Sequence, residues 1–263
     1  MNSADAYRPE DSAVFCVDGI TAGVVRRFTP DISWGDYVSW LRARRPELSV
    51  VHLAQPYDWL ELITGRADPL ARLQQQMLRQ AEEQLSASPR FVVVLGFSLG
   101  GLTALQLTRQ VVQRSPQALP DYLAFVTFGT PFKGTGRLQD MLIRQLPQDY
   151  FQAMFDVERT RACLDGLLEF GLTAQLRLLI GEIAADEMVS ASSSLLPVHW
   201  LTARPLPDGL RWGTFEIEPA AALRAHDGLL HDPQAIGYID GLVDGLLPPA
   251  GPATTYEPFS QRG

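Results

Sequence analysis

The sequence predicts an α/β protein with a mostly parallel central sheet and helices on both of its faces. Short, unbroken apolar runs alternate with segments of helical periodicity, and this alternation is typical of a parallel sheet that is buried on both sides. The 263 residues suit one domain of this class, and a composition of 46% hydrophobic and 20% charged residues excludes a disordered chain. We therefore expect a single folded domain over residues 1–247.

Each expected element follows from a local signal. The apolar runs that mark strands are 13–17, 48–53, 91–95, 122–128 and 176–183. A last strand is expected within 195–218, where prolines and glycines obscure its position. Helical periodicity follows Gly100, and the pairs Asp68-Pro69 and Asp232-Pro233 each supply a helix N-cap with a first-turn proline.

The segment at about 136–174 does not fit the alternation. It has helical character and a large apolar surface, which allows two interpretations. One is a crossover helix with an ordinary surface helix, and the other is a cap or lid that shields an apolar pocket. The working hypothesis is a cap inserted into the domain. After it, the proline-rich tail at 248–263 is expected to lie outside the fold.

Charge and composition restrict the partners. The net charge is -8, and Lys133 is the single lysine, so a nucleic-acid partner is not expected. The zinc-type spacings of His, Cys and Glu are missing, as are the glycine-lysine patterns of nucleotide sites, and we expect neither a metal nor a cofactor. The two cysteines, Cys16 and Cys163, are expected to be reduced thiols.

The beginning of the sequence, MNSADAYRPEDSA, has neither a basic start nor an apolar stretch, and no segment approaches the length of a transmembrane helix. These features predict a cytoplasmic protein without a transmembrane segment. Export by a route that needs no cleaved signal remains an alternative.

The strongest functional signal is the pentapeptide Gly96-Phe97-Ser98-Leu99-Gly100. A G-x-S-x-G pattern alone is weak, but here an apolar strand precedes it and a helix follows it, as a nucleophile turn requires. The flanking glycines leave room for a tight turn, and the helix N-terminus favours negative charge near the serine. Ser98 is therefore the candidate nucleophile.

A serine hydroxyl needs a base, and the base needs an orienting carboxylate. Four histidines are available. His52 precedes the serine on an expected strand, and His199 could lie inside another strand. His226 lies in the loop before the last helix, where a base belongs, and is preferred to His231 beside the helix cap. For the carboxylate, Asp186 follows the strand after the expected cap, with Glu182 and Glu187 as competitors.

These blocks together resemble the α/β-hydrolase superfamily, and within it lipase- and esterase-like members. Besides the serine turn, the chain has Gly-Thr-Pro-x-x-Gly at 129–134, Asp-x-x-Val with following serines at 186–194, and a histidine with paired apolar residues and a proline at 226–233. The resemblance implies an α/β-hydrolase fold and a triad of Ser98, Asp186 and His226. It also implies an oxyanion hole formed by the backbone N–H groups of Leu99 and Ile20.

One position departs from that pattern. The resemblance predicts His-Gly after the first strand, and this chain has Asp18-Gly19 instead. An acidic side chain beside the oxyanion hole would weaken it, unless the Asp18 carboxylate turns away and bonds the loop backbone.

The resulting hypothesis is a serine hydrolase that cleaves a carboxylic ester, with a small-molecule acyl ester or a lipid as its substrate. Three alternatives share the same residues. They are a thioesterase or acyltransferase, a phospholipid-directed effector, and a catalytically inactive binding protein with this fold, which the Asp18 departure alone supports.

Overall fold

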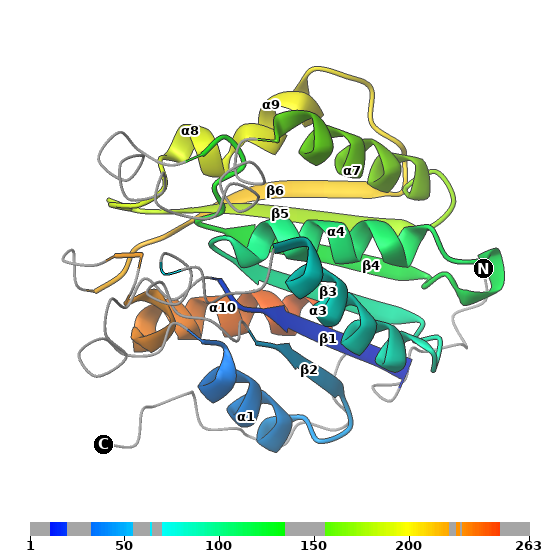
Figure 1. Cartoon of the computed structure of the whole chain (residues 1–263), viewed down its shortest axis with the longest axis horizontal. Coiled ribbons are helices and arrows are strands. Elements are labelled where there is room, and N and C mark those ends of the chain that lie inside the picture. The colour runs from blue at the N-terminus through cyan, green and yellow to red at the C-terminus, as the bar shows by residue number, and fades with distance from the viewer. Residues whose placement is uncertain are drawn as a thin grey trace.

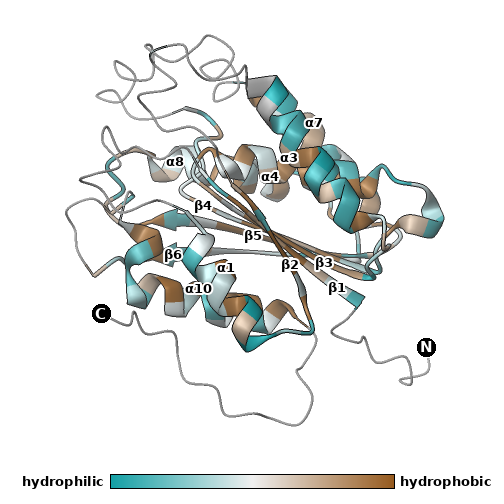
Figure 2. Cartoon of the chain, turned by 60° about the horizontal axis from the view of Figure 1, so that its bottom comes forward, coloured by the Kyte–Doolittle hydropathy of each residue, from teal (hydrophilic) through white to brown (hydrophobic). Residues whose placement is uncertain are grey.

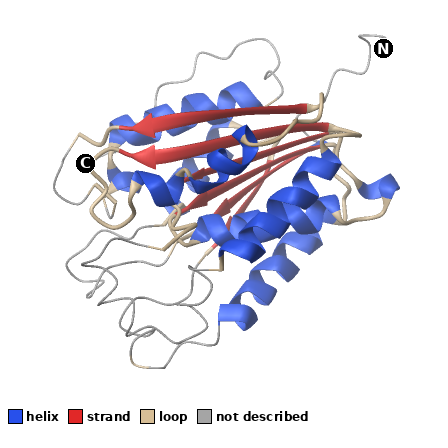
Figure 3. Ribbon diagram, turned by 90° about the horizontal axis from the view of Figure 1, so that it is seen from above, coloured by secondary structure: helices blue, strands red, loops and turns tan. Residues whose placement is uncertain are grey.

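The computed structural model describes residues 11–19, 33–54, 64, 70–134, 156–220, 225–226 and 228–247. Within these residues, six strands form one sheet in the order β2-β1-β3-β4-β5-β6, and every neighbouring pair is parallel (Figures 1 and 3). The strands are β1 (Ser12–Val17), β2 (Ser49–Leu53), β3 (Phe91–Phe97), β4 (Tyr122–Phe128), β5 (Gln175–Ile183) and β6 (Leu210–Ile217).

The central strand β3 explains why both faces of the sheet must be covered. All seven of its residues are buried, and its side chains alternate between two hydrophobic cores. Val92 and Val94 enter one core, and Val93 and Leu95 enter the other. A strand that is apolar on both sides is stable only between two helical layers, so the predicted fold class is confirmed.

Helices form these two layers (Figure 2). One core receives buried side chains from α3 (Leu70–Leu85), α4 (Gly100–Val112) and α7 (Val157–Phe170). The other core receives them from α1 (Gly35–Arg44) and α10 (Pro233–Leu246). Among the described residues, no helix is long and apolar enough to cross a lipid bilayer.

The strand order contains a reversal that positions the site. From β1 the chain continues through α1 to β2, and from β3 it continues through α4 to β4, on the opposite side of the sheet (Figures 1 and 2). At such a switch point, a crevice opens beyond the carboxyl ends of the strands, where α/β proteins bind ligands. Asp18 follows β1 and Ser98 follows β3, so both residues lie at this crevice.

Most expected elements lie where the sequence predicts them, and one does not. The last strand is β6, within the range expected for it. The expectation that His199 lies inside a strand is wrong, because His199 belongs to helix α9 (Leu196–Thr202). Pro197 suits a first helical turn, and Pro197 and Leu201 are buried at the four-residue spacing of one helix face.

The described part of the 136–174 segment is α7, the helix between β4 and β5. Asp156 caps it by accepting a hydrogen bond from the N–H of Arg159, at 2.9 Å. Cys163, Leu164 and Leu167 bury its inner face in the core that it shares with α4. Residues 136–155 and the tail at 248–263 lie outside the described residues, so the cap and the external tail stay predictions.

Candidate active site

Ser98 lies in a turn that only small neighbours allow. Its φ is 53°, a left-handed conformation that costs a non-glycine residue energy. A Cβ on Gly96 would lie 2.6 Å from the Cα of Gly101, and one on Gly100 would lie 2.4 Å from the carbonyl oxygen of Asp18. Gly96 therefore lets β3 and α4 approach each other closely, and Gly100 lets the start of α4 approach the end of β1.

His226 connects Ser98 to Asp186. The Nε2 atom of His226 is 2.8 Å from the Ser98 Oγ, and its Nδ1 is 2.9 Å from the Asp186 Oδ2. An ionised carboxylate can only accept, so Nδ1 carries a hydrogen, and the neutral ring then accepts the serine hydroxyl at Nε2. The His226 and Asp186 side chains are only 4% and 3% exposed. The His226–Asp186 pair is thus largely shielded from solvent, whereas Ser98 is partly exposed.

The turn after β5 fixes the Asp186 carboxylate. Its Oδ1 accepts the N–H groups of Met188, at 2.7 Å, and Val189, at 2.8 Å, which leaves Oδ2 for the histidine. Ala185 just before it has a φ of 54°. Of the three non-glycine residues with positive φ among those described, two therefore flank this site, as is common where strain is part of function.

The two competing carboxylates are placed differently. Both oxygens of Glu187 lie 3.2 Å from the backbone nitrogen of His226, so Glu187 contacts the loop and not the ring. Glu182 lies on β5 opposite Glu216 of β6, and burial together with the Glu216 charge raises its pKa. Among the described residues, Asp186 is the carboxylate that bonds the His226 ring.

Two features of neighbouring strands hold the His226 ring in place. Its centroid lies 4.9 Å from that of the Phe97 ring. Gly129 has a φ of 55°, and a Cβ there would lie 3.2 Å from the His226 Cε1. The glycine that opens the Gly-Thr-Pro block thus makes room for the imidazole.

The remaining histidines lie elsewhere. His199 is on α9, and His231 ends the short 3-10 helix η3 (Leu229–His231) just before α10. His52 lies on β2 and contacts Asp18. In the described part of the chain, only His226 forms a hydrogen bond with Ser98.

The two predicted oxyanion donors differ in what the structure describes. Leu99 precedes the first residue of α4, and its N–H has no hydrogen-bond partner among the described residues. Such a free N–H at a helix N-terminus can donate a hydrogen bond to a negatively charged oxygen. Ile20 lies outside the described residues, so its role stays an expectation.

Asp18 is part of a second hydrogen-bonded group that the sequence did not indicate. Its Oδ1 accepts the N–H of Trp34, at 2.9 Å, and the Nε2 of His52, at 2.8 Å. Its Oδ2 accepts the hydroxyl of Ser33, at 3.0 Å. The signal that could have found this group is that Asp18 and His52 each lie at the carboxyl end of a strand, and such ends meet at one edge.

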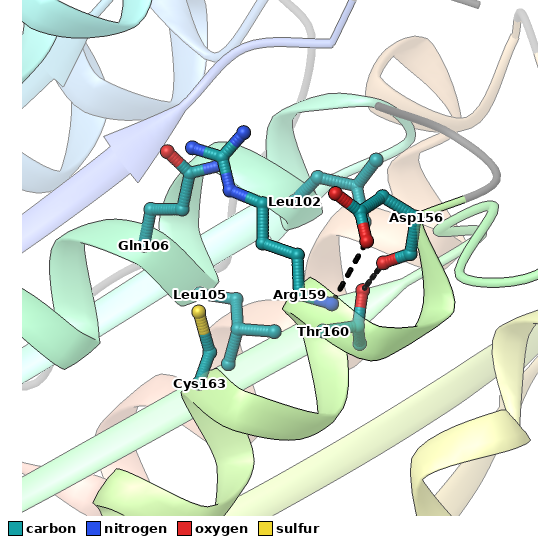
Figure 4. A pocket seen from close by; sticks show the side chains of 7 residues that line it. All are labelled: Leu102, Leu105, Gln106, Asp156, Arg159, Thr160 and Cys163. Atoms are coloured by element: carbon teal, nitrogen blue, oxygen red, sulfur yellow. Dashed lines mark hydrogen bonds between the residues drawn. The ribbon is translucent and has the colours of Figure 1, made fainter. Parts of the chain in front are cut away.

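Figure 4 shows a small cavity between α4 and α7, and Ser98, His226 and Asp186 are not among the residues that line it. Its volume of about 10 Å³ has room for roughly one water molecule, far less than an acyl chain needs. Its lining residues are Leu102, Leu105, Gln106, Asp156, Arg159, Thr160 and Cys163.

Neither cysteine is suited to nucleophilic chemistry. Cys16 and Cys163 are free and buried, and burial raises the pKa of both thiols, which keeps them protonated. No group of three or more metal-ligating side chains occurs within the described ranges.

Part of the chain is similar to a known protein family. A family model described as Lipase (class 3) matches residues 46–157, a range that includes Ser98 and ends before Asp186 and His226. No curated protein matches the chain.

Solved structures resemble the chain at low sequence identity. One belongs to LipS and LipT, two metagenome-derived lipolytic enzymes. It is 9% identical, has a TM-score of 0.54, and the match covers 91% of this chain and 96% of that one. A putative α/β hydrolase from Agrobacterium tumefaciens is 11% identical, with a TM-score of 0.49 and coverage of 93% and 91%. An esterase from Pyrococcus furiosus is 12% identical, with a TM-score of 0.49 and coverage of 91% and 82%.

The first of these structures shares the fold over nearly its whole length, and the class 3 lipase match covers the turn that holds Ser98. The chain therefore has the fold of an α/β hydrolase, and its residues 46–157 are similar to class 3 lipases.

Proposed function

We propose that the protein hydrolyses carboxylic esters, with Ser98 as nucleophile, His226 as general base and acid, and Asp186 as the residue that orients the imidazole. The observation that carries the proposal is the continuous hydrogen-bonded chain from the Ser98 hydroxyl through both His226 nitrogens to the Asp186 carboxylate. Its order along the sequence, serine, then acid, then histidine, is that of α/β hydrolases.

In the first half of the reaction, the Ser98 Oγ attacks the ester carbonyl carbon and its proton moves to the His226 Nε2. The Leu99 N–H, together with that of Ile20, stabilises the negative charge on the former carbonyl oxygen. When the C–O bond to the alcohol breaks, His226 returns the proton to the departing oxygen, and the acyl group stays on Ser98.

In the second half, His226 takes a proton from water, and the resulting hydroxide attacks the acyl-enzyme. The bond between the acyl carbon and the Ser98 Oγ then breaks, His226 returns its proton to that oxygen, and the carboxylic acid leaves. Throughout, Asp186 keeps the hydrogen on Nδ1, so that Nε2 is the nitrogen that exchanges protons with the serine and with water.

The substrate that we propose is a small-molecule acyl ester or a lipid. The similarity of residues 46–157 to class 3 lipases supports this class. With a net charge of -8, the protein has no general electrostatic attraction to anionic membranes, so recruitment of a lipid would rest on apolar contact.

A fluorophosphonate probe tests the proposal directly, because the Ser98 Oγ would form a bond to phosphorus as fluoride leaves and His226 takes the proton. We expect the probe to label the wild type and Ser86→Ala, in which an exposed hydroxyl far from the site is removed, and not Ser98→Ala. Hydrolysis of p-nitrophenyl butyrate should fall at least about 10³-fold in Ser98→Ala, with an unchanged melting temperature.

Labelling of Ser98→Ala, or failure to label the folded wild type, would contradict the proposal and favour the inactive binding protein. If the wild type is labelled, adding an alcohol during turnover separates a hydrolase from an acyltransferase. Free carboxylic acid should remain the main product for a hydrolase.

A further inference from the structure

We propose that Asp18 is a positioning residue that holds Gly19 against the nucleophile Ser98, through a hydrogen-bonded clamp formed with Ser33, Trp34 and His52. The clamp lies at the switch point of the sheet and is distinct from the Ser98–His226–Asp186 chain. The inference rests on the proposed function, because its effect is expressed through Ser98.

The clamp joins three separate parts of the chain. Asp18 follows β1, Ser33 and Trp34 precede α1, and His52 is on β2. The Asp18 carboxylate is 4% exposed and accepts three donors, with distances between 2.8 and 3.0 Å. A buried carboxylate is tolerated where its oxygens are satisfied in this way, and such an arrangement resists displacement.

The hydrogens in the clamp can be assigned from chemistry. The Asp18 Oδ1 can only accept, so His52 carries a hydrogen on Nε2 and donates it. The Ser33 hydroxyl donates to the Asp18 Oδ2 and accepts the N–H of Gly35, at 3.1 Å. The Ser33 hydrogen is therefore committed to the carboxylate, and His52 is in no position to remove it. The group can hold a structure but cannot generate a second nucleophile.

The backbone next to the clamp touches the nucleophile. The Asp18 N–H donates to the Leu53 carbonyl at 3.1 Å, and the start of α4 lies close to the Asp18 carbonyl oxygen, where only the hydrogen of Gly100 fits. One residue further, a Cβ on Gly19 would lie 2.8 Å from the Ser98 Cβ and 3.4 Å from its Oγ. Gly19 thus packs directly against the Ser98 turn, and Asp18 determines the position of Gly19.

A displacement of the Gly19 backbone by a fraction of an ångström should affect the alignment of the reacting atoms more than the binding of the substrate in its ground state. We therefore expect Asp18→Ala to lower kcat by about 10- to 100-fold while KM changes less than about threefold. The inactivation rate with fluorophosphonate should fall in proportion to kcat. A residue that acts only on stability would instead leave kcat of the folded fraction unchanged.

Asp18→Asn supplies the rescue. Its amide oxygen can still accept from Trp34 and His52, and its amide nitrogen can donate to the Ser33 oxygen, so we expect kcat within about fivefold of the wild type. The matched control is Asp240→Ala, which removes a carboxylate that bonds Arg44, between α1 and α10. This control should alter the melting temperature and leave kcat unchanged.

If Asp18→Ala does not fold, His52→Phe and Ser33→Ala each remove one donor and should each lower kcat a few-fold at constant KM. The inference is overturned if the wild type is labelled at Ser98 while all folded clamp variants keep kcat within twofold, or if KM alone changes. An unlabelled wild type would instead overturn the proposed function, and the inference with it.

Discussion

Two aspartate–histidine pairs lie at the carboxyl edge of this sheet, each with a serine nearby, and their chemistry differs. The Asp186 Oδ2 lies 2.9 Å from the His226 Nδ1, and the Asp18 Oδ1 lies 2.8 Å from the His52 Nε2. In the first pair the histidine uses one nitrogen for the carboxylate and the other for Ser98. In the second pair, a single nitrogen, the His52 Nε2, lies near both the Asp18 carboxylate and, at 3.3 Å, the Ser33 Oγ. Only the first arrangement can pass a proton from serine to imidazole.

The comparison shows that residue types and distances do not by themselves identify a triad. Ser33 donates its hydrogen directly to the Asp18 carboxylate, whereas Ser98 is separated from the Asp186 carboxylate by a whole imidazole ring. Ser98 also sits in a left-handed turn at the start of α4. Ser98, His226 and Asp186 are therefore arranged for proton transfer, whereas Asp18, His52 and Ser33 are arranged for positioning.

The largest contrast should come from matched substitutions of the two histidines. We expect His226→Gln to lower kcat for p-nitrophenyl butyrate by about 10⁴-fold, because glutamine cannot accept and return the proton. His52→Gln keeps an N–H donor for Asp18 and should lower kcat less than about threefold. Steady-state kinetics of both variants measure this. Similar losses in the two would erase the distinction between the pairs.

Gly19→Ala tests the backbone contact that links the Asp18–His52 pair to Ser98. The added methyl group would lie 2.8 Å from the Ser98 Cβ and 2.9 Å from the Phe97 carbonyl oxygen, so the backbone must shift. We expect kcat to fall by about 10²-fold.

The control is Gly213→Ala on β6, where the new methyl group meets Leu179 at an ordinary 3.5 Å and kcat should stay unchanged. Full activity of a folded Gly19→Ala variant would mean that the serine turn tolerates movement there.

Glu187 holds the backbone of His226, the histidine of the first pair. Because its carboxylate accepts the backbone N–H of His226, Glu187→Ala should let the base move and lower kcat by about tenfold. Glu187→Gln keeps an accepting oxygen and should recover activity to within about threefold. Glu182→Gln, on the same stretch of chain but without contact to His226, is the matched control and should retain wild-type kcat.

The smallest effect concerns Asp240, a half-buried carboxylate with no part in either pair. Burial is the main cause that raises its pKa from 3.8 to about 6, against the opposing effect of Arg44. A raised pKa means that this group contributes stability in its protonated form, complete below pH 3.8 and lost as the pH rises through about 6.

The melting temperature of the wild type relative to Asp240→Asn should therefore fall by about 2–4 °C between pH 4.5 and pH 8. A difference that stays constant with pH would show that Asp240 titrates at the same pH in the folded and unfolded chains. The kcat ratio of the two proteins should not change.

Local signals predicted much of the fold. The apolar runs correspond to β1 through β5, and the Asp232-Pro233 pair begins α10, with the Asp232 side chain accepting two of its first N–H groups. The glycine-flanked serine was equally readable, because the turn demands small residues at neighbouring positions in the chain. His199 was misplaced since a short apolar run with a proline fits either a strand or a helix.

Ser98, Asp186 and His226 lie together as the sequence predicted, because the carboxyl ends of parallel strands share one edge. Asp186 was preferred to Glu187 by its position after the strand alone, because no local signal shows in which direction adjacent residues of a turn point. Only the turn geometry, with Met188 and Val189 holding one Asp186 oxygen, assigns the other oxygen to the histidine.

Periodicity and the size of neighbouring side chains were sufficient to predict the α/β class, the positions of β1 through β5 and the glycine-flanked turn at Ser98. The tertiary structure decided that Asp18 turns to His52, 34 residues away, and that its neighbour Gly19 meets Ser98. Those contacts depend on strand order and register at the switch point, which no local pattern of residues encodes.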